Sequence, residues 1–135
     1  MITGVRKIVV PVDDQQKALD FWTDRMGFTV TTDAAYGAER WIEVTPPDQS
    51  VALVLSLRAP DEPRRQVPDQ LPHSDVHFTC ADIARTYDEL SGRGVVFPTP
   101  PTRMDFGWWA MFSDCDGTRY ALGCESISSE ASCAA

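Results

Sequence analysis

The feature that most constrains the fold is an internal repeat, because the second half of the chain restates the pattern of the first at an offset of 68 residues. At this offset residues 9–12 align with residues 77–80, and Asp14 aligns with Asp82. A slip of one residue then brings residues 26–28 onto residues 93–95. Identities are few, but each half is expected to run strand, helix, glycine, strand. The repeat therefore predicts two modules of one architecture.

In the first half, residues 7–12 are rich in β-branched side chains and predict a strand. Asp13 or Asp14 caps the following helix, which Gly27 ends in a left-handed conformation. Further strands are expected at residues 28–32, 41–45 and 51–57. The last of these is apolar apart from Ser56, which predicts a strand that is buried on both faces or covered by a partner.

The second half predicts the same order of elements. A strand is expected at residues 75–80 and a helix at 83–91, with Ile83, Tyr87 and Leu90 on one face. A short strand at 95–97 is expected to give way to a loop at the prolines of residues 98–101. Residues 108–113 and 118–124 predict a hairpin.

Length and charge narrow the function classes. The 135 residues suit one domain of residues 1–126, with modules at about 4–57 and 74–126, a proline-rich linker at 58–73 and a flexible tail at 127–135. A formal charge of -8 disfavours nucleic acid and anionic membrane surfaces as partners. No basic segment followed by an apolar core opens the chain, so a cytoplasmic protein is expected. The four cysteines lack metal-site spacing and are expected to be free thiols.

Two stretches resemble a known family. Residues 18–22 (ALDFW) lead to the MGF of residues 26–28, and residues 109–112 (WAMF) lead to the DCDG of residues 114–117. Together with the repeat, they resemble the vicinal oxygen chelate superfamily, which includes glyoxalase I, bleomycin-resistance proteins and extradiol dioxygenases. The resemblance covers about residues 4–126. It implies an α+β fold in which two βαβββ modules form curled mixed sheets.

The resemblance also implies four metal-ligand positions, on the first and last strands of the modules. Carried onto this chain, they fall on Lys7, near Leu55, on Asp75 and on Ala121. A divalent ion needs lone pairs from imidazole, carboxylate or thiolate, and Lys7 is a cation without an acceptor. We therefore expect no metal ion and no other cofactor. Lys7 and Asp75 could form an ion pair in its place, or each could be solvated.

The two-residue period of strands predicts which side chains share a face with these positions. His77 is expected beside Asp75, Met111 opposite Ala121, and Trp109 opposite Gly123. Trp41 and Glu43 are expected on one face of their strand. The candidate ligand-binding residues are Lys7, Trp41, Glu43, Leu55, Asp75, His77, Trp109, Met111 and Ala121.

The function expected first is that of a metal-free protein of the bleomycin-resistance type. It would hold a small organic molecule, a drug or a metabolite, in a tryptophan-lined cavity, with negative charge favouring an amine. One alternative is a metal-dependent lyase or dioxygenase whose ligands lie elsewhere. Another is a metal-free isomerase or epimerase, in which His77 or Glu43 would be the catalytic base. A homodimer is expected, because the apolar strand 51–57 needs covering and the family often shares cavities between subunits.

Overall fold

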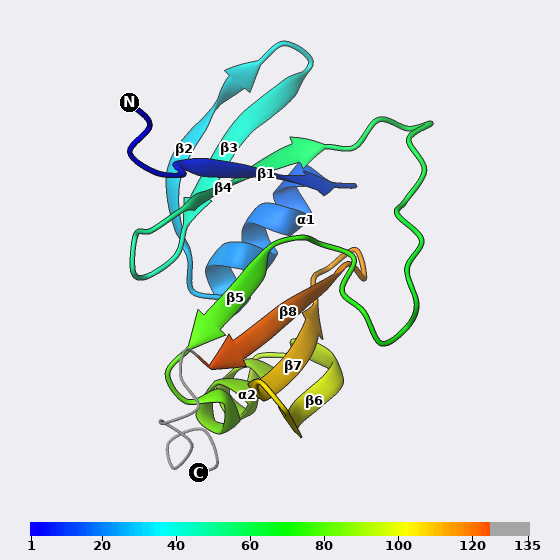
Figure 1. Ribbon diagram of the computed structural model, residues 1–135. Helices are drawn as coiled ribbons and strands as arrows, with labels where there is room; N and C mark the ends of the chain where they lie inside the picture. The colour runs from blue at the N-terminus through cyan, green and yellow to red at the C-terminus, as the bar shows by residue number, and fades with distance from the viewer. Residues whose placement is uncertain (125–135) are drawn as a thin grey trace. The chain divides into compact units, whose positions relative to one another are not determined.

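The computed structural model describes residues 1–124 and divides the chain into two compact units, Met1–Pro63 and the part from Arg64 onward. Each unit is a βαβββ module with a four-stranded mixed sheet (Figure 1). The strand order is β1-β4-β3-β2 in module 1 and β5-β8-β7-β6 in module 2. In each sheet the first strand runs parallel to the last, and the other pairs are antiparallel. The α+β class and the repeated architecture are as predicted.

Module 1 begins with β1 (Lys7–Val12) and α1 (Gln15–Asp20), and the helix continues as the π-helical turn η1 (Phe21–Arg25). Asp14 caps α1, because its carboxylate accepts a hydrogen bond from the Lys17 amide. Three strands follow: β2 (Thr29–Tyr36), β3 (Glu39–Thr45) and β4 (Ala52–Leu57). β2 extends four residues beyond its predicted end at residue 32, because it pairs with β3 up to Tyr36.

The core of module 1 lies between the helix and one face of the sheet. Trp22 and Phe21 of the helix are buried there. β4 is an inner strand, with β1 on one side and β3 on the other, and Leu53, Val54 and Leu55 are at most 2% exposed. The centre of the apolar run is therefore covered within the chain and needs no partner, whereas Leu57 at its end is 43% exposed.

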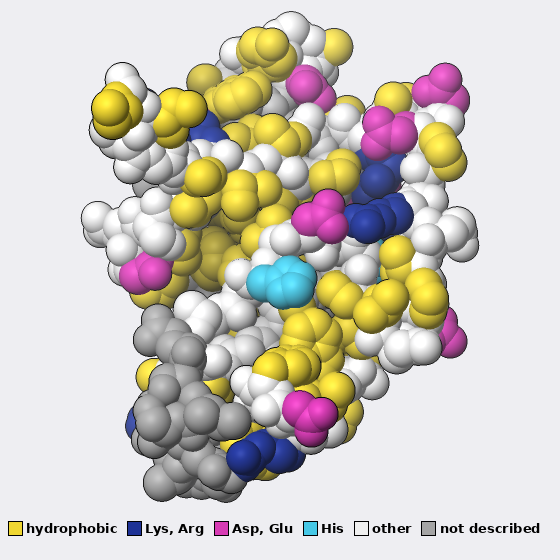
Figure 2. Space-filling model, in the orientation of Figure 1, with side chains coloured by type: hydrophobic (Ala, Val, Ile, Leu, Met, Phe, Trp, Pro, Cys, Tyr) yellow, Lys and Arg dark blue, Asp and Glu magenta, His cyan; other side chains and the backbone are white. Residues whose placement is uncertain are grey.

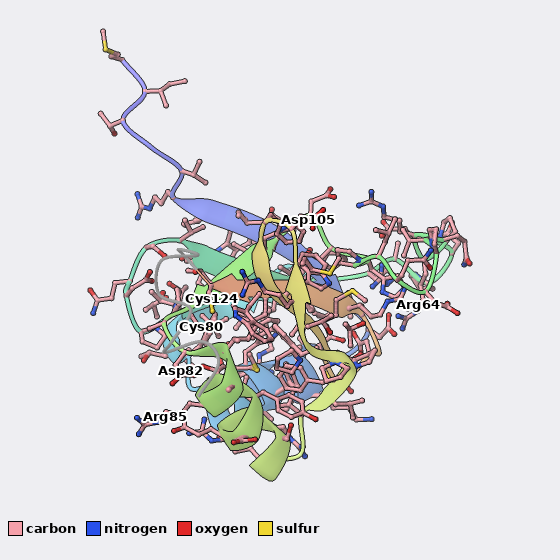
Figure 3. The ribbon with its side chains drawn as sticks, turned by 60° about the horizontal axis from the view of Figure 1, so that its bottom comes forward. Arg64, Cys80, Asp82, Arg85, Asp105 and Cys124 are labelled. Atoms are coloured by element: carbon pink, nitrogen blue, oxygen red, sulfur yellow. The ribbon has the colours of Figure 1, made fainter. Side chains whose placement is uncertain are left out.

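Module 2 comprises β5 (His77–Cys80), α2 (Ile83–Gly92), β6 (Val96–Met104), β7 (Gly107–Ser113) and β8 (Arg119–Cys124). Asp82 caps α2 by accepting a hydrogen bond from the Arg85 amide, and both residues lie at the start of this helix in Figure 3. The predicted loop at residues 98–101 is wrong, since these residues belong to β6. An edge strand tolerates prolines, and β6 is an edge strand whose pairing with β7 shifts register on both sides of Thr99.

The core of module 2 is aromatic. Phe112 stacks on Tyr120 with ring centroids 5.5 Å apart, and Phe78 and Phe97 pack against the same ring of Phe112. Tyr87 of α2 meets Phe97 edge-on at 4.9 Å. The helix therefore covers the face of the sheet that carries Phe112 and Tyr120. The residues adjacent to these two in their strands point to the opposite face, because successive side chains of a strand alternate.

The cysteines differ from the expectation of four free thiols. Cys80 and Cys115 are free, whereas Cys124 is disulfide-bonded. Cys80 and Cys124 are register partners on the adjacent strands β5 and β8, and Figure 3 shows them side by side.

The expected tail at residues 127–135 lies outside the described residues. No helix in the described part of the chain is long and apolar enough to cross a membrane.

Candidate functional site

The strand register defines one face of the module 1 sheet that does not pack on the helix. Val9 is the register partner of Val54, and Val54 is the partner of Glu43. Lys7 precedes Val9 by two residues and Trp41 precedes Glu43 by two, so both share this face. We call these five residues, Lys7, Val9, Trp41, Glu43 and Val54, the module 1 face. Leu55 was expected here, but it lies on the opposite face, in the core with Val10, its register partner.

A hydrogen-bonded cluster occupies the module 1 face. The ammonium of Lys7 donates to Glu43 Oε2 at 2.7 Å, and the indole N–H of Trp41 donates to the same oxygen at 2.7 Å. The Glu43 side chain is 10% exposed and that of Lys7 is 34% exposed. The hydrogen bonds from Lys7 and Trp41 lower the pKa of Glu43, so this carboxylate is charged at neutral pH.

The indole ring of Trp41 is held from several sides. Besides the bond to Glu43, the Lys7 ammonium lies 5.8 Å from the ring centroid, and Tyr36 meets the ring edge-on at 5.3 Å. Such contacts fix the plane of an indole before any ligand arrives. Trp41 therefore presents an oriented aromatic surface next to a paired charge.

Gln15 explains how β3 and β4 diverge beside this cluster. The two strands pair only at Glu43–Val54 and Val44–Leu53. Beyond that point the buried amide of Gln15 donates to the carbonyls of Arg40 and Leu55 and accepts from the Arg40 N–H. The side chain thus replaces the missing strand-to-strand hydrogen bonds, which keeps the buried backbone groups satisfied while the sheet opens.

Module 2 has an equivalent face, on which the predicted register is confirmed. Ala121 is the partner of both His77 and Met111, and Gly123 is the partner of Trp109. We call these residues, His77, Trp109, Met111, Ala121 and Gly123, the module 2 face. Met111 and Ala121 are buried, whereas His77 is exposed and Trp109 is half-buried.

His77 and Trp109 lie together on the module 2 face. Their rings meet edge-on with centroids 6.1 Å apart. Phe106, in the turn before β7, also meets this indole edge-on, at 5.9 Å, and is itself 66% exposed. Sequence reasoning missed Phe106, and its only signal was its place three residues before Trp109. Trp108 points the other way, toward the aromatic core, since it alternates with Trp109 along β7.

Asp75 lies before β5 rather than within it, and its side chain is 89% exposed. Its carboxylate pairs with Arg65 at 2.8 Å, while the carboxylate of Glu43 pairs with Lys7. Each of the two candidate carboxylates therefore already has a cationic partner in its own module.

The second half of the linker is bound to module 2, around His73. The backbone N–H of Arg119 donates to His73 Nδ1 at 2.9 Å, and the backbone N–H of His73 donates to the Arg119 carbonyl. The Arg119 guanidinium also donates to the carbonyls of Leu71 and Pro68. Burial, and then the charge of Arg119, lower the pKa of His73, so its imidazole stays neutral and can accept this hydrogen bond. His73 is thus a structural residue.

The donor atoms do not fit a divalent metal ion at the positions that the resemblance assigns. Lys7 offers an ammonium, and the last strands of the two modules offer Val54 or Leu55 and Ala121, which are hydrocarbons. Asp75 offers a single exposed carboxylate. Within residues 1–124, no three side chains of His, Cys, Asp or Glu gather as a metal site requires.

Comparison with known proteins agrees with this architecture. The family model described as "Glyoxalase/Bleomycin resistance protein/Dioxygenase superfamily" matches residues 4–122. The chain belongs to this superfamily. It is 34% identical to the uncharacterized protein YetH of Bacillus subtilis over 123 residues, which are 90% of this chain and 98% of that protein.

Two solved structures are similar over nearly the whole chain. TnmS3, an antibiotic binding protein from Streptomyces sp. CB03234, is 33% identical with a TM-score of 0.77, and the match covers 93% of this chain and 98% of that one. A superfamily member from Sphaerobacter thermophilus is 30% identical with a TM-score of 0.76, and here the match covers 92% and 98%. Broad hydrophobic areas with scattered charges are visible on the surface in Figure 2.

Proposed function

We propose that this protein binds a small organic molecule, a drug or a metabolite, at a tryptophan-bearing face of a module, and that it does so without a metal ion and without making or breaking a bond. Its biological effect would then be sequestration of the ligand. An antibiotic is the ligand class that the similarity to TnmS3 favours.

The observation that carries the proposal is the matching placement of Trp41 and Trp109. They are separated by the repeat offset of 68 residues and lie on the same strand position of each module, β3 and β7. Each indole is fixed edge-on by a neighbouring ring, Tyr36 or Phe106. A fixed indole loses little freedom on stacking with a planar ligand, which favours binding.

The proposal is tested by titrating the protein with chloramphenicol, doxorubicin and bleomycin while tryptophan fluorescence is recorded. At least one antibiotic should bind saturably and be recovered unchanged. Replacing Trp41 or Trp109 by alanine should weaken that binding by about fivefold, since one aromatic contact contributes about 1 kcal/mol. Elemental analysis of the purified protein is the second arm, and one equivalent of zinc, nickel or iron would overturn the metal-free proposal.

A catalytic role is the second candidate, and here the two suggested bases differ. Glu43 is a poor general base near neutral pH, because its hydrogen bonds to Lys7 and Trp41 lower its pKa. His77 is exposed and lies against Trp109, which favours it as the base of an isomerase or epimerase. If the protein is such an enzyme, His77→Ala should abolish turnover while ligand binding survives.

A homodimer remains part of the proposal, although it no longer rests on the centre of the apolar strand β4, residues 53–55, which the chain buries itself. Its remaining support is the shared cavities common in the superfamily. Size-exclusion chromatography with light scattering should give twice the 15.0 kDa chain mass. A mass equal to one chain at micromolar concentration would contradict it.

A further inference from the structure

We propose that the Lys7–Glu43 pair makes the module 1 face selective for an uncharged ligand group that carries a hydrogen-bond acceptor next to a donor, as an amide does. This inference rests on the proposed function and names the chemistry of the ligand at one of its two faces. It replaces the amine that the acidic composition favoured.

The first argument is the unused hydrogen-bonding capacity of Glu43. Its Oε2 accepts two hydrogen bonds, one from Lys7 and one from Trp41. Its Oε1 has no hydrogen-bond partner among residues 1–124 and is not fully buried. A carboxylate accepts about four hydrogen bonds in all, so Oε1 remains available for a donor group of a ligand.

The second argument is the unused capacity of Lys7. An ammonium has three N–H groups, and in the described residues one of them donates, to Glu43. The Lys7 side chain is 34% exposed, and Val9 next to it on the same face is 60% exposed, so this end of the face is open to solvent. A free donor and a free acceptor therefore lie side by side.

The third argument is charge. The ammonium and the carboxylate neutralise each other at a separation of 2.7 Å. A cationic ligand would be attracted by Glu43 but repelled by Lys7. An anionic ligand would be attracted by Lys7 but repelled by Glu43. A neutral amide avoids both penalties, because its carbonyl accepts from Lys7 while its N–H donates to Glu43.

The indole ring of Trp41 adds an aromatic surface to the groups that a ligand of the module 1 face can contact. Trp41 donates to the same carboxylate, so its indole lies beside the polar pair. The Lys7 ammonium is 5.8 Å from the ring centroid, which is near the outer limit of a cation–π contact. The ligand expected here is therefore a planar aromatic body with an amide at its edge.

The test uses four probes of one shape: 2-naphthamide, 2-methylnaphthalene, 2-naphthylmethylammonium and 2-naphthoate. Their affinities for the full-length protein are measured by isothermal titration calorimetry. The amide should bind about tenfold more tightly than the hydrocarbon, because it adds hydrogen bonds to charged groups that the hydrocarbon cannot make. The cation and the anion should bind no more tightly than the hydrocarbon.

Two variants change the preference in opposite directions. Lys7→Met leaves Glu43 without its cation, so 2-naphthylmethylammonium should become the tightest probe. Glu43→Gln leaves Lys7 without its anion, so 2-naphthoate should become the tightest. A residue that only supports the fold would weaken all probes together. Asp33→Asn is the matched control, because it breaks an ion pair of the same sheet, with Arg40, away from this face, and the order of the probes should not change.

The outcomes separate the inference from the proposed function. If 2-methylnaphthalene binds but the amide binds no more tightly, or if either variant that folds by circular dichroism keeps the wild-type order, the inference falls and aromatic binding stands. If no probe binds up to its solubility limit, aromatic binding at this face falls, and the inference falls with it.

Discussion

The two modules share a register but present different chemistry on equivalent faces. Trp41 and Trp109 match at the repeat offset, whereas Glu43 matches Met111 and Lys7 matches Asp75. Module 1 thus carries a paired charge beside its indole, and module 2 carries a thioether and an exposed imidazole beside its own. Strand pairing determines which positions share a face, and the side chains at those positions determine what the face can bind.

The helix side shows a second difference between the modules. Gln15 opens α1 and Ile83 opens α2, again at the repeat offset, and both are buried. Gln15 bridges β3 and β4 by hydrogen bonds, whereas Ile83 contributes only apolar contact surface. A polar residue is needed in module 1 because the pairing of β3 with β4 covers two residue pairs there, while β7 and β8 pair over five.

The largest loss of stability is expected when Gln15, at the start of α1, is replaced by an apolar residue like Ile83 at the start of α2. Gln15→Leu leaves the Arg40 N–H and the carbonyls of Arg40 and Leu55 without their partner. The free energy of unfolding should fall by about 3 kcal/mol, since each unsatisfied buried group costs about 1–3 kcal/mol.

Urea unfolding followed by circular dichroism measures this loss. Gln16→Leu is the matched control, because Gln16 is exposed on the same helix and binds Asp20 and Arg40 at the surface. Gln16→Leu should lower the free energy of unfolding by less than about 0.5 kcal/mol. Equal losses in the two variants would show that the bridge across β3 and β4 adds nothing.

Most of the fold was predictable from the sequence because the repeat supplies the same information twice. The register of Met111 with Ala121 followed from alternation and a hairpin whose turn was recognisable. The prediction that Leu55 lies on the ligand-binding face was wrong for a physical reason. The sequence does not indicate how long the loop between β3 and β4 is, and a slip of one residue moves a side chain to the other face of the sheet. Val54 is the residue that shares the face of Glu43.

The site itself was less predictable, since it depends on which side chains meet across strands. Lys7 and Glu43 are 36 residues apart, and nothing in their spacing indicates a pair. The sequence suggested instead that Lys7 and Asp75 could pair, because they are equivalent in the repeat. The observed partners, Glu43 and Arg65, depend on side-chain reach within each module.

The turns before the last strands give the second prediction. In module 2, Asp114 is buried and accepts hydrogen bonds from the amides of Asp116 and Thr118 and from the Tyr120 hydroxyl. In module 1, Asp48 is exposed and accepts hydrogen bonds from the amide and the hydroxyl of Ser50. Asp114→Ala should lower the free energy of unfolding by about 2 kcal/mol, and Asp48→Ala by about 0.5 kcal/mol. Thermal and urea unfolding check this order, and a larger loss for Asp48→Ala would contradict it.

The smallest expected effect concerns the linker, which is bound to module 2 through His73. Because its pKa is lower in the folded chain than its ordinary value of 6.5, the unfolded chain binds more protons just below that value. The contribution of His73 to stability is therefore complete above the ordinary pKa and is lost as the pH falls through 6.5 toward the folded pKa. His73→Asn supplies an acceptor oxygen that does not titrate.

The variant should match the wild type near pH 7.5 and lose less stability on acidification to about pH 5.5, where carboxylates are still largely ionised. Urea unfolding at the two pH values measures the difference. If the two proteins lose stability in parallel, the hydrogen bond between the Arg119 amide and His73 does not couple the linker to pH. A steeper loss in the variant would reverse the sign of the linkage, because it would require a folded chain that binds the proton more readily than the unfolded one.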